Sequence, residues 1–91
     1  MFRVFFKASA EKIFSSLSLQ LQEKITGAIF RVANNPFVNH RNLKKLSGFG
    51  SGYRMRIGRW RIIYHLNDLD KEIEILDIFL KKGKDDYSRR L

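Results

Sequence analysis

The chain has 91 residues, enough for one hydrophobic core and too few for two, because single domains usually span about 100 to 150 residues. Eighteen Lys and Arg against nine Asp and Glu leave a net charge of +9, so we expect attraction to polyanions, nucleic acid first and an acidic protein second. A hydrophobic content of 44% excludes a disordered basic tail. The absence of Cys excludes a disulfide scaffold, a thiolate nucleophile and Cys-ligated zinc.

Targeting segments and metal sites are not predicted. Only three apolar residues run together before Lys7, far short of a signal h-region of roughly 7 to 15 residues. No stretch approaches the ~18 apolar residues that span a bilayer, so we expect a cytoplasmic protein with no membrane contact. Two His residues, His40 and His65, and few convergent carboxylates predict no metal and no cofactor.

The first third of the chain predicts a strand followed by two helices. Residues 2–7 are rich in Phe and Val, which favours a short buried strand. Ser9 is expected to cap a helix that ends near Ser18, and Ser18 to cap a second helix that ends at Asn34-Asn35-Pro36. Two helices with almost no spacer should form an antiparallel hairpin. Their apolar stripes are Ala10, Ile13, Phe14 and Leu17, and then Leu21, Ile25, Ala28, Ile29 and Val32.

The rest of the chain predicts a loop and a three-stranded meander. Residues 36–52 hold the only Pro and three of the six Gly, which is typical of a loop. From Tyr53 the apolar positions alternate with period two, and Gly58-Arg59 permits a tight turn between two strands. A second turn at 67–70 leads to a third strand over 72–80. We therefore predict one α+β domain of order β-α-α-β-β-β, a mainly antiparallel sheet of about four strands with the N-terminal helical hairpin packed on one face.

Alternation along the meander separates an apolar face from a basic face. The opposite face holds Arg54, Arg56, Arg61 and His65 if the helices are faced by Tyr53, Met55, Ile57, Trp60, Ile62 and Tyr64. Arginine forks bind phosphate oxygens bidentately and keep their charge, which suits a phosphodiester and the negative charge that grows as it is cleaved. The alternative interpretation is that these side chains only form the solvated face of an antiparallel sheet.

The run YRMRIGRWRIIY from Tyr53 to Tyr64 resembles the signature hairpin of the RelE/ParE toxin superfamily, in which Tyr-Arg-x-Arg-x-Gly-x-aromatic-Arg-apolar-apolar-Tyr recurs. Further matches occur in the family's order over nearly the whole chain. They are Ala10-Glu11-Lys12, Asn35-Pro36, the run LKKLSG at 43–48, and a basic end that contains Tyr87. The hairpin is shared by members that cut messenger RNA on the ribosome and members that poison DNA gyrase.

This resemblance implies a single RelE/ParE-like domain over residues 1–91 with a RelE-like fold. The function it implies is that of a type II toxin, a ribosome-dependent endoribonuclease that cleaves mRNA in the A site and inhibits translation. Its partners would be mRNA on the ribosome, with contacts to 16S rRNA, and a cognate acidic antitoxin encoded nearby. The alternatives are a ParE-like DNA gyrase inhibitor and a non-catalytic module that binds antitoxin or nucleic acid. Arg61, the tail lysines and Tyr87 favour the RelE branch.

Site residues follow from the same resemblance. The implied catalytic residues are Arg54, Arg56, Arg61, Lys81 and Tyr87, and the implied RNA-binding residues are His65, Lys82, Lys84 and Arg89. Lys82 and Lys84 compete with Lys81 for its role, and the Tyr87 ring either stacks on a base or packs on the sheet edge.

One departure concerns proton transfer. Several RelE-like nucleases resemble one another in having lysines where this chain has Arg54 and Arg56, and arginine is a poor base. A metal-independent cleavage must deprotonate the 2′-hydroxyl and protonate the leaving 5′-oxygen. The candidate proton carriers are therefore His65, Tyr64, Tyr87 and the tail lysines.

Overall fold

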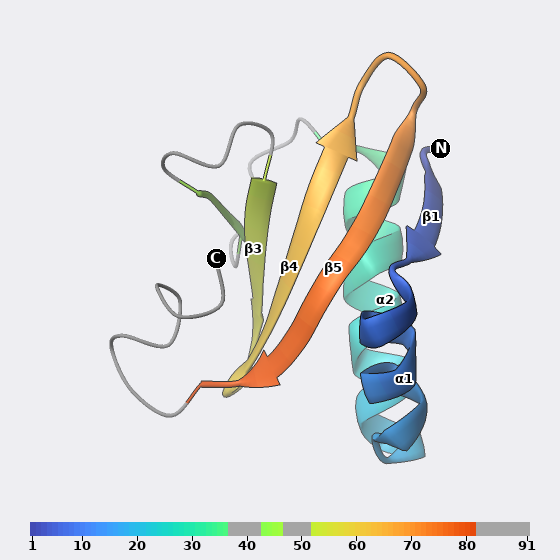
Figure 1. Cartoon of the computed structure of the whole chain (residues 1–91). Helices are drawn as coiled ribbons and strands as arrows, with labels where there is room; N and C mark the ends of the chain where they lie inside the picture. Colours follow the sequence, from blue (N-terminus) through green and yellow to red (C-terminus); the bar gives the residue numbers. More distant parts are fainter. Residues whose placement is uncertain (37–42, 47–51, 82–91) are drawn as a thin grey trace.

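The computed structural model describes residues 1–36, 43–46 and 52–81, which form one sheet and two helices (Figure 1). The five strands follow the spatial order β1-β5-β4-β3-β2. β1 pairs with β5 in parallel, and the other neighbours are antiparallel. The elements are β1 (Arg3–Phe6), α1 (Ala8–Ser16), α2 (Leu19–Asn34), β2 (Leu43–Lys45), β3 (Gly52–Ile57), β4 (Trp60–Asn67) and β5 (Glu72–Leu80).

The α+β class and the N-terminal helical pair are confirmed, but the sheet has five strands and not about four. The additional strand is β2, which lies in the segment predicted as a loop. It pairs with β3 through Leu43↔Met55 and Lys45↔Tyr53, and the Leu46 N–H donates to the Gly52 carbonyl at 3.0 Å. Three residues are too few to show a period of two, so the neighbouring strand and not the local pattern determines this element.

The two helix starts differ in how they are capped. Ser18 caps α2 as predicted, because its hydroxyl accepts a hydrogen bond from the Leu21 N–H at 3.2 Å. The predicted Ser9 cap of α1 is wrong. The chain turns from β1 into α1 without a spacer, so Lys7 is the N-cap residue: its N–H donates to Ile75 and its carbonyl accepts from Glu11, both at 2.9 Å.

The core lies between the helices and the sheet. α2 contributes the fully buried Ile25 and the nearly buried Val32, and α1 contributes Ala10. The sheet contributes Ile62 and Ile75, both fully buried. The helix-facing side of the sheet therefore carries the apolar half of the alternation, as predicted, and the opposite side carries the arginines together with the buried Ile63 and Phe79.

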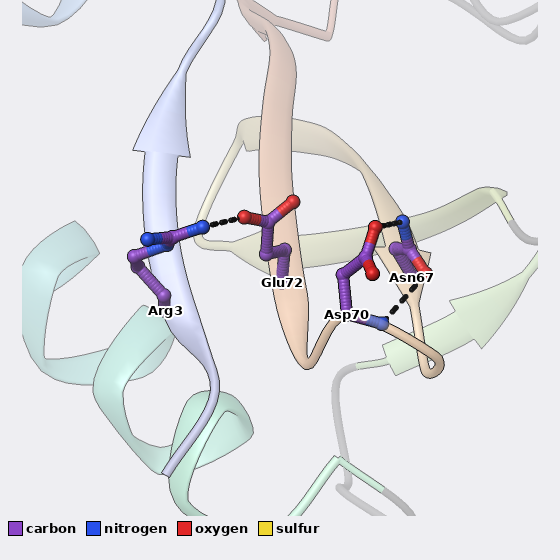
Figure 2. A network of polar contacts seen from close by, with 4 residues as sticks. All are labelled: Arg3, Asn67, Asp70 and Glu72. Atoms are coloured by element: carbon purple, nitrogen blue, oxygen red, sulfur yellow. Dashed lines mark hydrogen bonds and ion pairs between the residues drawn. The ribbon is translucent and has the colours of Figure 1, made fainter.

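Two turns connect the meander strands. Gly58 has a φ of 60°, and it is the first residue of the two-residue β3–β4 turn, where a type II′ geometry requires glycine. In the β4–β5 turn the Asn67 side chain accepts from the Asp70 N–H at 3.1 Å and donates to its carboxylate at 2.9 Å (Figure 2). Both turns lie where the sequence predicts them, and the first one fixes the register of the arginines.

β5 contains an irregularity that the sequence pattern does not reveal. The register shifts between Ile63, which pairs with Asp77, and Tyr64, which pairs with Ile75. The extra residue, Leu76, changes the parity of the strand, so Ile75 and Ile78 both face the helices although they are three positions apart. The same shift places Asp77 on the open face.

Candidate nucleic-acid interface

Three arginines gather on the face of the sheet that the helices leave open. Arg56 lies directly opposite Arg61 in the β3–β4 ladder, and Arg54 lies opposite Ile63. Directly opposed residues are about 4.5–5.5 Å apart and diagonal neighbours about 7–8 Å apart, so Arg54 is a diagonal neighbour of Arg61 and of His65. The structure thus brings together Arg54, Arg56 and Arg61, which we call the arginine patch.

Arg61 is the most constrained member of the arginine patch. It is only 7% exposed, and its Nη1 atom donates to the carbonyls of Gly58 and Trp60, each at 2.9 Å. Phe79, 3% exposed, is its pairing partner on β5. The guanidinium is therefore held in one orientation by the turn that precedes it. A charge fixed before a ligand binds loses little conformational entropy on binding.

Lys81 is placed at the same end of the sheet as Arg61. Its backbone N–H donates to the Arg59 carbonyl at 2.8 Å, which holds the residue after β5 beside the β3–β4 turn. This position fits the implied role of Lys81 next to the arginine patch. The other residues predicted from the C-terminal segment lie outside the described residues: Lys82, Lys84, Tyr87 and Arg89.

His65 belongs to the opposite end of the open face. It lies four residues from Arg61 along β4, which corresponds to about 13 Å at ~3.3 Å per residue. Its pairing partner is Glu74, and both line a small pocket of about 270 Å³. Glu72 at this end forms an ion pair with Arg3 (Figure 2). The structure therefore places His65 beside carboxylates, and Arg54 is only its diagonal neighbour.

This acidic end is a feature that sequence reasoning missed. Glu72 and Glu74 lie on the strand that the pattern predicts over 72–80, two positions apart and hence on one face. Their alternation with Ile73 and Ile75 is enough to predict that both glutamates lie on the face opposite the apolar core. The open face therefore carries positive charge near the β3–β4 turn and negative charge near the β4–β5 turn.

Tyr64 is excluded as a proton carrier on the open face. It is 1% exposed and faces the helices, where its ring stacks on Tyr53 at a centroid separation of 5.5 Å. Burial, with a smaller contribution from Tyr53, raises the pKa of the Tyr64 hydroxyl above its ordinary value. The period-two alternation already places Tyr64 on the side of the sheet opposite Arg61, so the sequence alone is enough to exclude Tyr64 as a proton carrier beside Arg61.

Neither of the two helices is long and apolar enough to cross a membrane. Within residues 1–36, 43–46 and 52–81, no group of three or more His, Asp or Glu is placed to hold a metal ion. Phosphate recognition by arginine is the chemistry that the open face offers directly.

Comparison with known proteins identifies the family. A model of the ParE toxins of type II toxin-antitoxin systems (parDE) matches residues 2–84. The chain belongs to this family of toxins, within the RelE/ParE superfamily. The comparison of the toxin with curated proteins found no match.

Solved structures similar to this toxin include RelE proteins. The isolated RelE toxin of E. coli superposes with a TM-score of 0.80 at 18% identity, over 99% of this toxin and 95% of that chain. The RelE-RelB complex of Pyrococcus horikoshii OT3 gives a TM-score of 0.78 at 27% identity, over 91% and 98% of the two chains. The intact E. coli RelBE toxin-antitoxin complex gives 0.78 at 18% identity, over 91% and 100%. The toxin thus has the RelE fold.

Proposed function

We propose that this toxin is a RelE-like endoribonuclease that cuts messenger RNA in the ribosomal A site. The observation that supports this proposal is the arginine patch, with Arg61 held in place by two backbone carbonyls. Guanidinium groups bind the non-bridging oxygens of a phosphodiester in a fork geometry. A partly buried, preorganised charge stabilises the transition state more than a solvated one does, because little reorganisation accompanies the reaction.

The proposed reaction is attack of a 2′-hydroxyl on the adjacent phosphorus. The new P–O2′ bond forms as the P–O5′ bond breaks, which leaves a 2′,3′-cyclic phosphate and a free 5′-hydroxyl. A base must accept the 2′-proton and an acid must donate one to the leaving oxygen. Among the described residues, Lys81 lies beside the β3–β4 turn that also holds Arg61. His65 lies two residue pairs beyond the Arg54–Ile63 pair of the ladder. Tyr87 is the further proposed participant.

The family model supports a second candidate function, inhibition of DNA gyrase, because it describes ParE toxins. The sheet and helices do not discriminate between the two targets. Arg61 and Lys81, both placed near the β3–β4 turn, favour RNA cleavage, since a protein that only blocks gyrase has no need of a fixed charge beside a proton carrier.

Parallel assays with the purified toxin distinguish these functions. We expect discrete cuts, detected by primer extension, in an mRNA loaded on programmed ribosomes, and none in the same mRNA alone. Supercoiling by purified gyrase should remain unchanged. Loss of supercoiling with intact mRNA would select the gyrase function, and no effect in either assay would select a non-catalytic binding module.

The proposed partners are the translated mRNA with its 16S rRNA surroundings and a cognate acidic antitoxin. The net charge of +9 supports both, because complementary charge accelerates association. Related RelE toxins have been crystallised with RelB antitoxins. Co-expression with the neighbouring reading frame should yield a complex whose association rate falls as salt rises. Failure of an acidic partner to co-purify would contradict the antitoxin proposal.

A further inference from the structure

The arginine patch can bind a phosphodiester, but none of its three members can give up a proton. A guanidinium group is not deprotonated in proteins, so its contribution is charge and hydrogen bonding alone. His65 lies on the same face, but its pairing partner is Glu74, and a carboxylate repels the phosphate of the substrate. A proton donor for the leaving 5′-oxygen is therefore to be sought on the strands that flank the patch.

β2 supplies such a group at the edge of the patch. Lys44 is the residue directly opposite Arg54 in the antiparallel β2–β3 ladder, so both side chains lie on the open face. Directly opposed residues are about 4.5–5.5 Å apart and diagonal neighbours about 7–8 Å, which makes Arg56 a diagonal neighbour of Lys44. Lys44 is exposed to solvent. Its ammonium group adds to the three arginines a cation that carries a transferable proton.

The backbone of Lys44 is held on both sides. Leu43, the preceding residue, pairs with Met55 and packs against the core. Beyond the strand, the Leu46 N–H donates to the Gly52 carbonyl at 3.0 Å. β2 is short, but these contacts fix where the side chain of Lys44 begins. Its four-carbon stem is flexible enough for the ammonium to follow an oxygen atom as a bond to phosphorus lengthens.

Charges across the open face draw a phosphate toward this edge. Lys44, Arg54, Ile63 and Asp77 form one row across β2, β3, β4 and β5. The Asp77 carboxylate at the β5 end of this row repels a phosphodiester, and the two cations at the β2 end attract it. The row therefore favours a phosphate position over β3, next to Lys44.

The cleavage reaction also requires groups on two sides of the phosphorus, because the attacking and leaving oxygens lie roughly in line. β3 and β4, which carry the arginine patch, lie between β2 and β5 in the sheet. Lys81 follows β5, where its N–H donates to the Arg59 carbonyl at 2.8 Å. Lys44 and Lys81 thus flank the arginines from opposite sides.

We propose that Lys44 is a catalytic residue, the general acid of RNA cleavage. As the P–O5′ bond breaks, its electron pair passes to the 5′-oxygen, which takes a proton from the Lys44 ammonium group. The neutral amine then regains a proton from solvent, which has received the 2′-proton through the base, so the site returns to its starting state. The inference rests on the proposed function, because it names the acid of that reaction.

Substitutions of two adjacent lysines test the proposal. Lys45 follows Lys44 on the same strand and is also exposed, but it pairs with Tyr53 and lies on the helix-facing side. General acid catalysis contributes about 10²–10⁴-fold, so Lys44→Ala and Lys44→Arg should lower the single-turnover rate on programmed ribosomes at least about a hundredfold. Lys45→Ala and Lys45→Arg should cut at the unmutated rate.

The arginine variant separates proton transfer from charge. Lys44→Arg keeps the positive charge and should bind programmed ribosomes as well as the unmutated toxin does. If Lys44→Arg also cuts at the unmutated rate, Lys44 contributes charge alone and the proposal is overturned.

A change in the substrate identifies which oxygen receives the proton. In an mRNA with sulfur in place of the bridging 5′-oxygen at the cut site, the leaving group is a thiolate, which departs without being protonated. Lys44→Ala and the unmutated toxin should therefore cut this mRNA at similar rates. A defect as large as that on ordinary mRNA would show that Lys44 does not protonate the leaving group.

Chemical rescue provides a test of the amine itself. The chain contains no Cys, so Lys44→Cys introduces its sole thiol. Alkylation of the purified variant with 2-bromoethylamine places an ammonium group at the end of a side chain as long as that of lysine. Cutting should be slow before alkylation and recover after it, whereas Lys45→Cys should cut normally throughout. A folded, alkylated Lys44→Cys variant that stays slow would contradict the proposal.

These results also separate the inference from the nuclease function on which it rests. If the unmutated toxin cuts no mRNA on programmed ribosomes, the nuclease function fails and the role of Lys44 fails with it. If the unmutated toxin cuts and both Lys44 variants cut equally fast, the nuclease function stands and only the role of Lys44 is wrong.

Discussion

Replacement of Arg61 by alanine is the sharpest test of the arginine patch. Loss of one preorganised charge beside a developing negative charge costs about 3 kcal/mol of transition-state stabilisation, or roughly a hundredfold in rate. The same change removes two charge-assisted hydrogen bonds at 2.9 Å, to Gly58 and Trp60. Because the Gly58 carbonyl belongs to the β3–β4 turn and can accept from water instead, we expect the loss of these two hydrogen bonds to lower the free energy of unfolding by about 1.5–3 kcal/mol.

The assay must therefore separate activity from folding. Rates of mRNA cutting on programmed ribosomes should be measured well below the melting temperature of Arg61→Ala, which should fall by roughly 4–8 °C per kcal/mol. Arg61→Lys keeps the charge but loses the fork, so we expect an intermediate rate. Arg31→Ala, on α2 and away from the open face, is the control and should cut normally. If folded Arg61→Ala cuts as fast as the unmutated toxin, the assignment of the site is wrong.

Three further predictions concern glycine, pH and the aromatic of the C-terminal segment. Gly27→Ala should raise the free energy of unfolding by about 1 kcal/mol, because its Cβ has room. Gly58→Ala should lower the free energy of unfolding by about 1–2 kcal/mol, because the φ of this residue is 60°. Thermal denaturation measures both changes, and shifts of equal sign would contradict this reasoning. Burial raises the pKa of Tyr64, so its contribution to stability is complete below the ordinary pKa of about 10 and is lost above it. Denaturant titrations at about pH 9 and about pH 11 should therefore show a smaller alkaline loss for Tyr64→Phe than for the unmutated chain, and identical losses would refute the assignment. Near-normal mRNA cutting by Tyr87→Phe, with slow cutting by Tyr87→Ala, would mean that the ring stacks on a base, whereas equal losses would mean that the hydroxyl transfers a proton.

Alternation was a reliable guide where both strands of a hairpin are long. The helix-facing positions alternate with period two in 53–57 and again in 60–66, on either side of the turn at 58–59, and the separation of Arg54, Arg56 and Arg61 from the apolar face follows from it. β2 could not be predicted in this way, since Leu43–Lys45 is a strand only because β3 offers its edge. The parity change at Leu76 was hidden within a run of apolar residues that reads the same with or without a bulge.

The sequence predicts which residues form the arginine patch, but it does not predict how each of them is buried and hydrogen-bonded. Pattern alone treats its three arginines as equivalent solvated side chains. The structure distinguishes them, because the carbonyls of Gly58 and Trp60 bind Arg61 and leave it 7% exposed, while Arg56 is exposed. Such differences depend on turn geometry and cross-strand neighbours, which a linear pattern does not contain. Lys44 was missed for the same reason, since its place opposite Arg54 follows from the pairing of two strands and not from the pattern of either one.

The parallel pairing of β1 with β5 sets the order in which a newly made chain can fold. Arg3 pairs with Glu72, 69 positions later, whereas α1 and α2 need only local contacts and can form early in synthesis. Until residues 72–80 have been translated, β1 lacks its neighbour and both helices lack much of the surface they cover. The sheet is therefore completed only once β5 has been translated, and the helices gain their full packing surface at the same step.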